Sequence, residues 1–153
     1  MCGFVGVHSF DGSLGRDILN LMAEEISHRG PDSRGMEIWP ATALFHNRLS
    51  IIDLTQASDQ PMHASGHTIV YNGEIYNFKE IREVLKKLGS EFKSDGDAEV
   101  VLHAYIQWRE KCLNRFNGMF AFAIYDGNSI FLARDRYGIQ PLYYYLDDHH
   151  FIF

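Results

Sequence analysis

Two apolar runs joined by a short turn constrain the fold more than any other feature of the sequence. Residues 119–125 read Met-Phe-Ala-Phe-Ala-Ile-Tyr and residues 129–134 read Ser-Ile-Phe-Leu-Ala-Arg, with Asp-Gly-Asn at 126–128 between them. Asp, Gly and Asn are preferred in tight hairpin turns, so the pattern predicts two antiparallel strands. Neither run alternates apolar with polar residues, which indicates strands that are buried on both faces. Such a hairpin needs further layers on each side of its sheet.

The other predicted elements supply those layers. Helices are expected where apolar residues recur every three or four positions, at residues 14–27, at residues 77–89, and from Asp95 or Asp97 onward, with either aspartate as the cap. The Asn72-Gly73 pair predicts a tight turn after a strand. Strands are expected at residues 3–8, 36–39, 41–45, 49–54 and 68–71, and a second hairpin at 142–146 and 151–153. The strands form an early and a late group with helices between them, so we predict an α+β fold of two sheets covered by helices.

Composition excludes several classes of function. The 153 residues suit one domain, and no apolar run reaches the roughly 18 residues that a membrane span needs. The net charge of −6, with Lys and Arg thinly spread, argues against nucleic acid. Cys2 and Cys112 are too few for a disulfide framework, and Cys112 is expected to pack in the core. His63 and His67 lack a third ligand, so no metal is expected. Nothing resembles a secretory leader, which favours the cytoplasm.

The N-terminus offers a possible nucleophile. Removal of Met1 would make Cys2 the first residue, so that a thiol and a free α-amine would belong to the same residue. An α-amine has a pKa of about 7.7 to 8.0, so it can accept the thiol proton near neutral pH. By itself this feature is weak evidence of catalysis, because many chains begin with Met-Cys.

Longer motifs strengthen that interpretation. They lie, in order, at residues 1–3, 28–32, 48–53, 71–77, 97–100, 120–123 and 133–142. Through these motifs the sequence resembles the glutaminase domain of class II glutamine amidotransferases, which are N-terminal-nucleophile hydrolases, and within them the asparagine synthetase branch. The resemblance implies a four-layer αββα sandwich of two mainly antiparallel sheets.

The resemblance also implies a site. Cys2 would attack glutamine, and the Asn72 side-chain amide and the Gly73 backbone amide would stabilise the oxyanion. Arg48 would grip the α-carboxylate of glutamine, since a guanidinium can bind a carboxylate through two hydrogen bonds. The remaining implied roles are pocket lining by backbone groups of Leu49, Ser50, Ile51 and Ile52, and binding of the α-ammonium by Glu74 and Asp97. Arg134 and Asp135 are interpreted as a structural ion pair.

Residues 1–153 would then form the glutaminase domain, expected to be incomplete because the strand at 151–153 has only begun. No cofactor is expected in this chain. ATP and Mg²⁺ would act in a synthetase domain that is absent here. The expected partners are glutamine and that synthetase domain, and a homodimer is left open. Two alternatives remain: an ammonia donor for a non-aspartate acceptor, such as a sugar or a secondary metabolite, and a non-catalytic glutamine-binding module.

Overall fold

The computed structural model describes residues 1–12, 14 and 16–153. Within them the strands form two antiparallel sheets. The first has the order β2-β3-β1-β9-β8, from β1 (Gly3–Ser9), β2 (Ser33–Ile38), β3 (Thr42–Arg48), β8 (Tyr145–Leu146) and β9 (His150–Ile152). The second has the order β4-β5-β6-β7, from β4 (Met62–Ala64), β5 (His67–Ile75), β6 (Gly118–Tyr125) and β7 (Ile130–Arg134). The helices are α1 (Arg16–Glu25), α2 (Phe78–Lys87) and α3 (Asp97–Trp108), with short 3₁₀ helices at η1 (Ser27–Arg29), η2 (Gln56–Ser58) and η3 (Arg109–Arg115).

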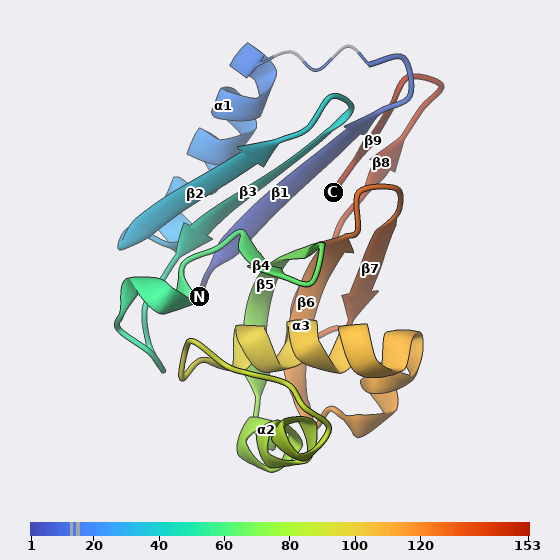
Figure 1. Ribbon diagram of the computed structural model, residues 1–153. Helices are drawn as coiled ribbons and strands as arrows, with labels where there is room; N and C mark the ends of the chain where they lie inside the picture. The colour runs from blue at the N-terminus through green and yellow to red at the C-terminus, as the bar shows by residue number, and fades with distance from the viewer. Residues whose placement is uncertain (13, 15) are drawn as a thin grey trace.

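The sheets and helices stack in four layers. Helix α1 lies on the outer face of the first sheet, and α2 and α3 lie on the second sheet (Figure 1). Leu44, Val70, Ala123, Tyr125 and Phe153 pack between the two sheets. The predicted αββα sandwich is therefore confirmed. The start of the predicted helix at 14–27 cannot be compared fully, because residues 13 and 15 lie outside the described part.

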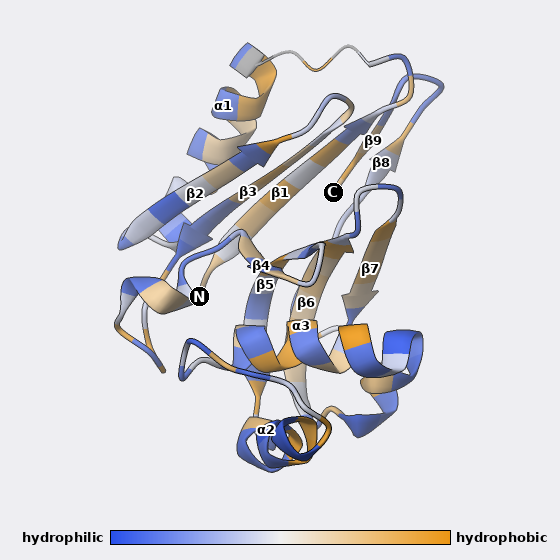
Figure 2. Cartoon of the chain, in the orientation of Figure 1, coloured by the Kyte–Doolittle hydropathy of each residue, from blue (hydrophilic) through white to orange (hydrophobic). Residues whose placement is uncertain are grey.

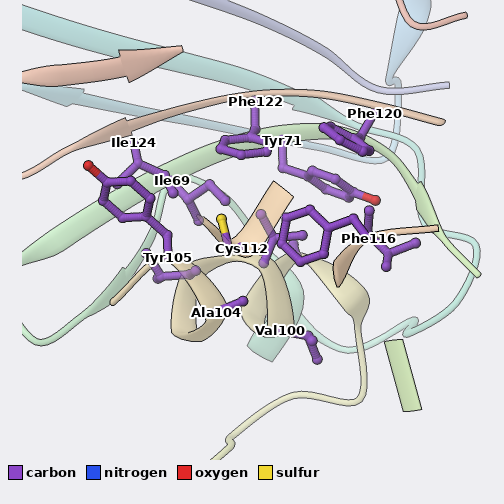
Figure 3. Close-up of a cluster of buried hydrophobic side chains, with 14 of the residues drawn as sticks. Ile69, Tyr71, Val100, Ala104, Tyr105, Cys112, Phe116, Phe120, Phe122 and Ile124 are labelled. Carbon is purple, nitrogen blue, oxygen red and sulfur yellow. The ribbon is translucent and has the colours of Figure 1, made fainter. Parts of the chain in front are cut away.

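Strand β6 is buried on both faces, as predicted. Phe120, Phe122 and Ile124 point toward α3, and Ala123 and Tyr125 point toward the first sheet. Figure 3 shows the first of these clusters, in which Cys112 packs among the aromatic rings. Cys112 is fully buried, which confirms its packing role, and burial raises the pKa of its thiol to about 12. In Figure 2, β6 is largely hydrophobic, whereas α2 carries hydrophilic and hydrophobic residues. Strand β7 is an edge strand and is only half-buried, contrary to the prediction.

The predicted strand at 49–54 is wrong. These residues form a loop in which Ile51 and Leu54 are 70% and 77% exposed. Strand β3 instead continues through the polar residues 46–48, which find buried partners. The His46 side chain contacts the Tyr71 carbonyl oxygen, and Asn47 Nδ2 donates to the Ala23 carbonyl oxygen. Polar residues therefore extend the strand because both of its faces are covered.

The predicted turn at Asn72-Gly73 is also wrong. Strand β5 runs through both residues, which pair with Ala121 and Phe120 of β6. A Cβ atom at position 73 would collide with the Met119 carbonyl oxygen, so the close approach of two strands requires glycine there.

Two further predictions are corrected. The chain order of the strands does not define the sheets, because β4 and β5 join β6 and β7, while β8 and β9 return to β1. The N-cap of α3 is Gly96, and Asp97 is the first helical residue, so neither predicted aspartate is the cap. The predicted helix end near Gly89 is confirmed, and the backbone of this glycine has φ 94°.

Candidate active site

The predicted site residues meet where the two sheets approach each other. Cys2 precedes β1 and Arg48 ends β3, two strands that pair with Gly3 opposite Asn47. Strand β5 of the second sheet and the start of α3 close the other side. One pocket is lined by Cys2, Arg48, Leu49, Ile51, Ile52, Asn72, Gly73, Glu74 and Asp97 together with Met1, Asp53, Ser58, Gln60, Tyr71, Gly96, Ala98, Met119 and Gln140. Ser50 is the predicted residue that does not line it, because its backbone N–H donates to Asp32 Oδ2 at 2.8 Å.

The Cys2 thiol is half-buried and held by backbone groups. Its Sγ accepts a hydrogen bond from the Leu49 N–H at 3.3 Å, and Arg29 Nε donates to the Cys2 carbonyl oxygen at 3.0 Å. Burial raises the pKa of the thiol, and the Leu49 N–H, the positive N-terminus and Arg48 oppose that rise. The sulfur is therefore mainly protonated at neutral pH, and its use as a nucleophile requires a base.

The backbone N–H of Gly73 points away from β6, on the side of β5 where no strand pairs with this residue. The N–H groups of Tyr71 and Ile75 face away from β6, because they donate to Gln60 Oε1 at 2.6 Å and Asp97 Oδ2 at 2.9 Å. Backbone groups alternate sides along an antiparallel strand, so the Gly73 N–H shares their direction. Phe120 lies opposite Gly73 in β6. Its N–H donates to the Asp135 carboxylate and its carbonyl oxygen accepts from the Asp135 N–H, so neither group bonds to β5, which agrees with this direction. Within the described residues the Gly73 N–H has no acceptor.

The Asn72 side chain is buried beside that N–H. Its Nδ2 donates to Gln140 Oε1 at 2.8 Å, which leaves the second Nδ2 hydrogen available. Gln140 Nε2 in turn donates to Met1 Sδ at 3.0 Å. Gln140 belongs to the matching segment at 133–142, but no spacing signal distinguished it, because the contact with Asn72 spans most of the chain.

The guanidinium of Arg48 is buried and partly occupied. Nη1 donates to the Thr55 carbonyl oxygen and to Asp59 Oδ1, both at 2.8 Å, and Nη2 donates to the Asp53 carbonyl oxygen. A guanidinium has five N–H donors. In the part of the chain described, one N–H on Nε and one on Nη2 remain without acceptors. Arg48 can therefore still donate two hydrogen bonds to a carboxylate.

Besides Asp53, the acidic residues Glu74 and Asp97 line the pocket. Asp97 Oδ2 accepts from the Tyr71 hydroxyl at 2.6 Å and from the Ile75 N–H, which leaves Oδ1 free of those bonds. Burial raises the pKa of Asp97, partly offset by these hydrogen bonds. Glu74 is exposed at the rim. The lining of this pocket thus combines the Arg48 guanidinium, carboxylates, the Cys2 thiol and two amide donors.

The Asp135 carboxylate holds the backbone of Gln140 in place through a hydrogen bond. The predicted ion pair with Arg134 is absent from the described residues. The Asp135 carboxylate instead accepts backbone N–H groups of Phe120, Tyr137, Ile139 and Gln140. These bonds tie the loop after β7 to β6.

The described residues contain neither a membrane-spanning helix nor a cluster of metal ligands. No helix there has the length and apolar character needed to cross a bilayer, and no three His, Cys, Asp or Glu side chains gather as metal ligands would.

The αββα sandwich, with Cys2 directly before its first strand, has a counterpart among solved structures. Glutamine phosphoribosylpyrophosphate amidotransferase from Bacillus subtilis has the same fold, with a TM-score of 0.81 over 99% of this chain and 41% of that chain, at 17% identity.

The chain belongs to the glutamine amidotransferase domain family, whose model matches residues 1–153. It is 37% identical to asparagine synthetase (glutamine-hydrolysing) 3 of Bacillus subtilis over 100% of this chain and 26% of that protein. It is 38% identical to a putative asparagine synthetase (glutamine-hydrolysing) 2 of Methanocaldococcus jannaschii, over 100% of this chain and 33% of that protein. Asparagine synthetase (glutamine-hydrolysing) 2 of Arabidopsis thaliana is 39% identical over 94% of this chain and 25% of that protein. The chain thus spans about a quarter to a third of these relatives.

Proposed function

We propose that this domain hydrolyses glutamine to glutamate and ammonia through a thioester on Cys2. The observation that carries the proposal is the convergence of one thiol, two amide donors, one arginine and two carboxylates on a single pocket of a glutamine amidotransferase domain. A free amino acid has a carboxylate and an ammonium at the same carbon, so it needs opposite charges at its binding end. Arg48 suits the carboxylate, and Asp97 with Glu74 suits the ammonium.

The reaction begins with removal of Met1, which frees the α-amine of Cys2. That amine takes the thiol proton as Sγ bonds to the amide carbon of glutamine. The oxygen becomes an oxyanion and receives hydrogen bonds from the Gly73 N–H and the second Nδ2 hydrogen of Asn72. The carbon–nitrogen bond then breaks, and the protonated α-amine returns its proton to the departing nitrogen as ammonia.

Water completes the cycle. It attacks the thioester carbonyl while the α-amine accepts one of its protons, and the same two donors again stabilise the oxyanion. The carbon–sulfur bond breaks, the proton passes to the sulfur, and glutamate leaves. No cofactor takes part in these steps, and no metal is needed at this pocket.

We further propose that the ammonia serves an asparagine-synthetase-type domain, because the curated relatives bear that name and are three to four times longer than this chain. ATP and Mg²⁺ would act in that domain, with aspartate as the acceptor. An acceptor other than aspartate remains the alternative for this step. The cytoplasm is the proposed location, and pairing with a second copy of the chain stays a prediction.

The first experiment compares glutamate release and covalent capture of a glutamine-analogue alkylator in the parent chain, Cys2→Ala and Cys112→Ala. The N-terminal mass is measured first, so that loss of Met1 is known. Cys2→Ala should lose both signals, whereas Cys112→Ala removes the buried thiol and should keep both. A folded parent chain that lacks Met1 and neither hydrolyses nor captures these ligands would instead be a glutamine-binding module without turnover.

A further inference from the structure

Asp53 lies at the centre of the hydrogen bonds that shape the pocket. Its side chain is only 8% exposed, and both carboxylate oxygens are occupied. Oδ1 accepts from the Thr55 N–H at 2.8 Å and the Thr55 hydroxyl at 2.7 Å. Oδ2 accepts from the Ser58 hydroxyl at 2.8 Å and the Asp95 N–H at 2.9 Å. Four donors leave this carboxylate little capacity for a ligand, so its effect on a ligand must pass through other residues.

Those bonds connect the segments that carry the two charged groups Arg48 and Asp97. On one side, the Asp53 carbonyl oxygen accepts from Nη2 of Arg48. On the other side, its carboxylate holds the Asp95 N–H, two residues before Asp97 and directly before the N-cap of α3. The segments at 48–59 and 95–97 are far apart in sequence, and Asp53 contacts both. It is therefore placed to set the separation between the Arg48 guanidinium and the Asp97 carboxylate.

The hydrogen bonds around Asp53 also keep its carboxyl group ionised. Burial alone would raise the pKa of this carboxyl, but the hydrogen bonds from Thr55, Asp95 and Ser58 hold the pKa well below its ordinary range. An Asn side chain offers one oxygen and an NH₂ group. In Asp53→Asn the NH₂ group would replace either Oδ1 or Oδ2. It would then face N–H and O–H donors that it cannot accept from, so the hydrogen bonds to Thr55 or the hydrogen bond to Asp95 would be lost.

We infer that Asp53 is a positioning residue for recognition of the α-amino-acid end of the substrate. This inference rests on the proposed function, since it assigns Arg48 and Asp97 to the α-carboxylate and α-ammonium of glutamine. Cys2, Asn72 and Gly73 make no hydrogen bond to Asp53 among the described residues. Loss of the Asp53 contacts should therefore weaken glutamine binding and leave the acyl-transfer step nearly intact.

The test measures kcat and KM for glutamine in the parent chain, Asp53→Asn and Asp126→Asn. Asp126 is the matched control, because its carboxylate also accepts the N–H groups of Asn128 and Ser129 and the Ser129 hydroxyl, but in the β6–β7 turn. Asp53→Asn should raise KM about tenfold or more and change kcat less than about threefold, whereas Asp126→Asn should change neither by more than about twofold.

A second readout separates positioning from a general loss of structure. Butyramide has the reacting amide without the α-substituents, so the ratio of kcat/KM for glutamine to that for butyramide measures α-end recognition. Asp53→Asn should reduce this ratio about tenfold, and the iodoacetamide reaction rate of Cys2 should stay within about twofold. If Asp53→Asn does not fold, Ser58→Ala removes a single bond and should raise KM about two- to fivefold.

The outcomes are distinguishable. A parent chain, freed of Met1, that does not release glutamate overturns the proposed function and this inference with it. An active parent chain whose KM and substrate ratio are unchanged in Asp53→Asn, or in Ser58→Ala if that variant is used, overturns the inference alone. An equal loss of kcat for glutamine and for butyramide would also overturn the inference alone, because it would place the effect of Asp53 at the reacting amide.

Discussion

Acidification should destabilise this fold through one buried histidine, His46. The ring is fully buried in β3, and its Nε2 lies 3.0 Å from the Tyr71 carbonyl oxygen. A carbonyl only accepts, so Nε2 carries the proton, and Nδ1 has no partner among the described residues. The pKa of His46 is lowered from 6.5 to about 4, chiefly by burial and also by the charge of Arg48, against the opposing effects of the Tyr71 carbonyl and Asp59.

The direction of the pH effect follows from proton binding. In the unfolded chain His46 takes up its proton near pH 6.5, but in the folded chain it does so only near pH 4. Between these values the unfolded state binds more protons, so stability is fully present above about pH 6.5 and falls as the pH falls toward 4. The gap corresponds to about 3 kcal/mol in total, of which about 2 kcal/mol is lost by pH 5.

Urea unfolding of the parent chain and His46→Gln at pH 7.5 and pH 5.0, at constant ionic strength, measures this loss. Gln can donate to the Tyr71 carbonyl but does not titrate. The parent chain should lose about 2 kcal/mol more between the two pH values than the variant. His103 also has a pKa lowered by burial, but it is present in both proteins and cancels in the comparison. Equal pH dependence in the two proteins would refute the assignment to His46.

Three substitutions in the pocket make separate predictions. Gly73→Ala places a methyl group against the Met119 carbonyl oxygen, so hydrolysis should fall at least about a hundredfold and the melting temperature should drop, as turnover assays and thermal unfolding would measure. Gln140→Met keeps the side-chain length without the amide oxygen that accepts from Asn72 Nδ2, so kcat should fall about tenfold with KM nearly unchanged. Asp97→Asn removes the charge offered to the α-ammonium, so KM for glutamine should rise about tenfold or more; an unchanged KM would remove Asp97 from the binding site.

Local signals in the sequence predicted the parts of the fold that depend on local structure. The β6–β7 hairpin follows from apolar runs and a turn of Asp, Gly and Asn. The end of α2 follows from Gly89, whose positive φ suits a helix C-terminus. The motifs that resemble a known family predicted most of the pocket, since nine of the ten proposed site residues line it.

Long-range contacts explain what the sequence could not predict. The sequence predicts separate strands at 41–45 and 49–54, but the polar residues 46–48 continue β3 because their partners lie in α1, β5 and the loop after β3. Asn72 and Gly73 have the composition of a turn, yet pairing with β6 keeps them extended. Asp53 and Gln140 lie in the motifs at 48–53 and 133–142, but the sequence predicts no role for them, because each acts through hydrogen bonds to distant residues that no periodic pattern encodes.

The hydrogen bond between His46 and the Tyr71 carbonyl also joins the two sheets beside the pocket. His46 belongs to the first sheet, two residues before Arg48, which ends β3, and its partner Tyr71 directly precedes Asn72 in the second sheet. The bond therefore helps to set the distance between Arg48, the proposed donor to the α-carboxylate, and Asn72 with Gly73, the proposed donors to the oxyanion. His46→Leu, which cannot donate this bond, should lower kcat/KM for glutamine more than His46→Gln does, even when both variants are assayed well below their unfolding temperatures. Equal activity of the two variants would mean that packing alone holds the sheets at that distance.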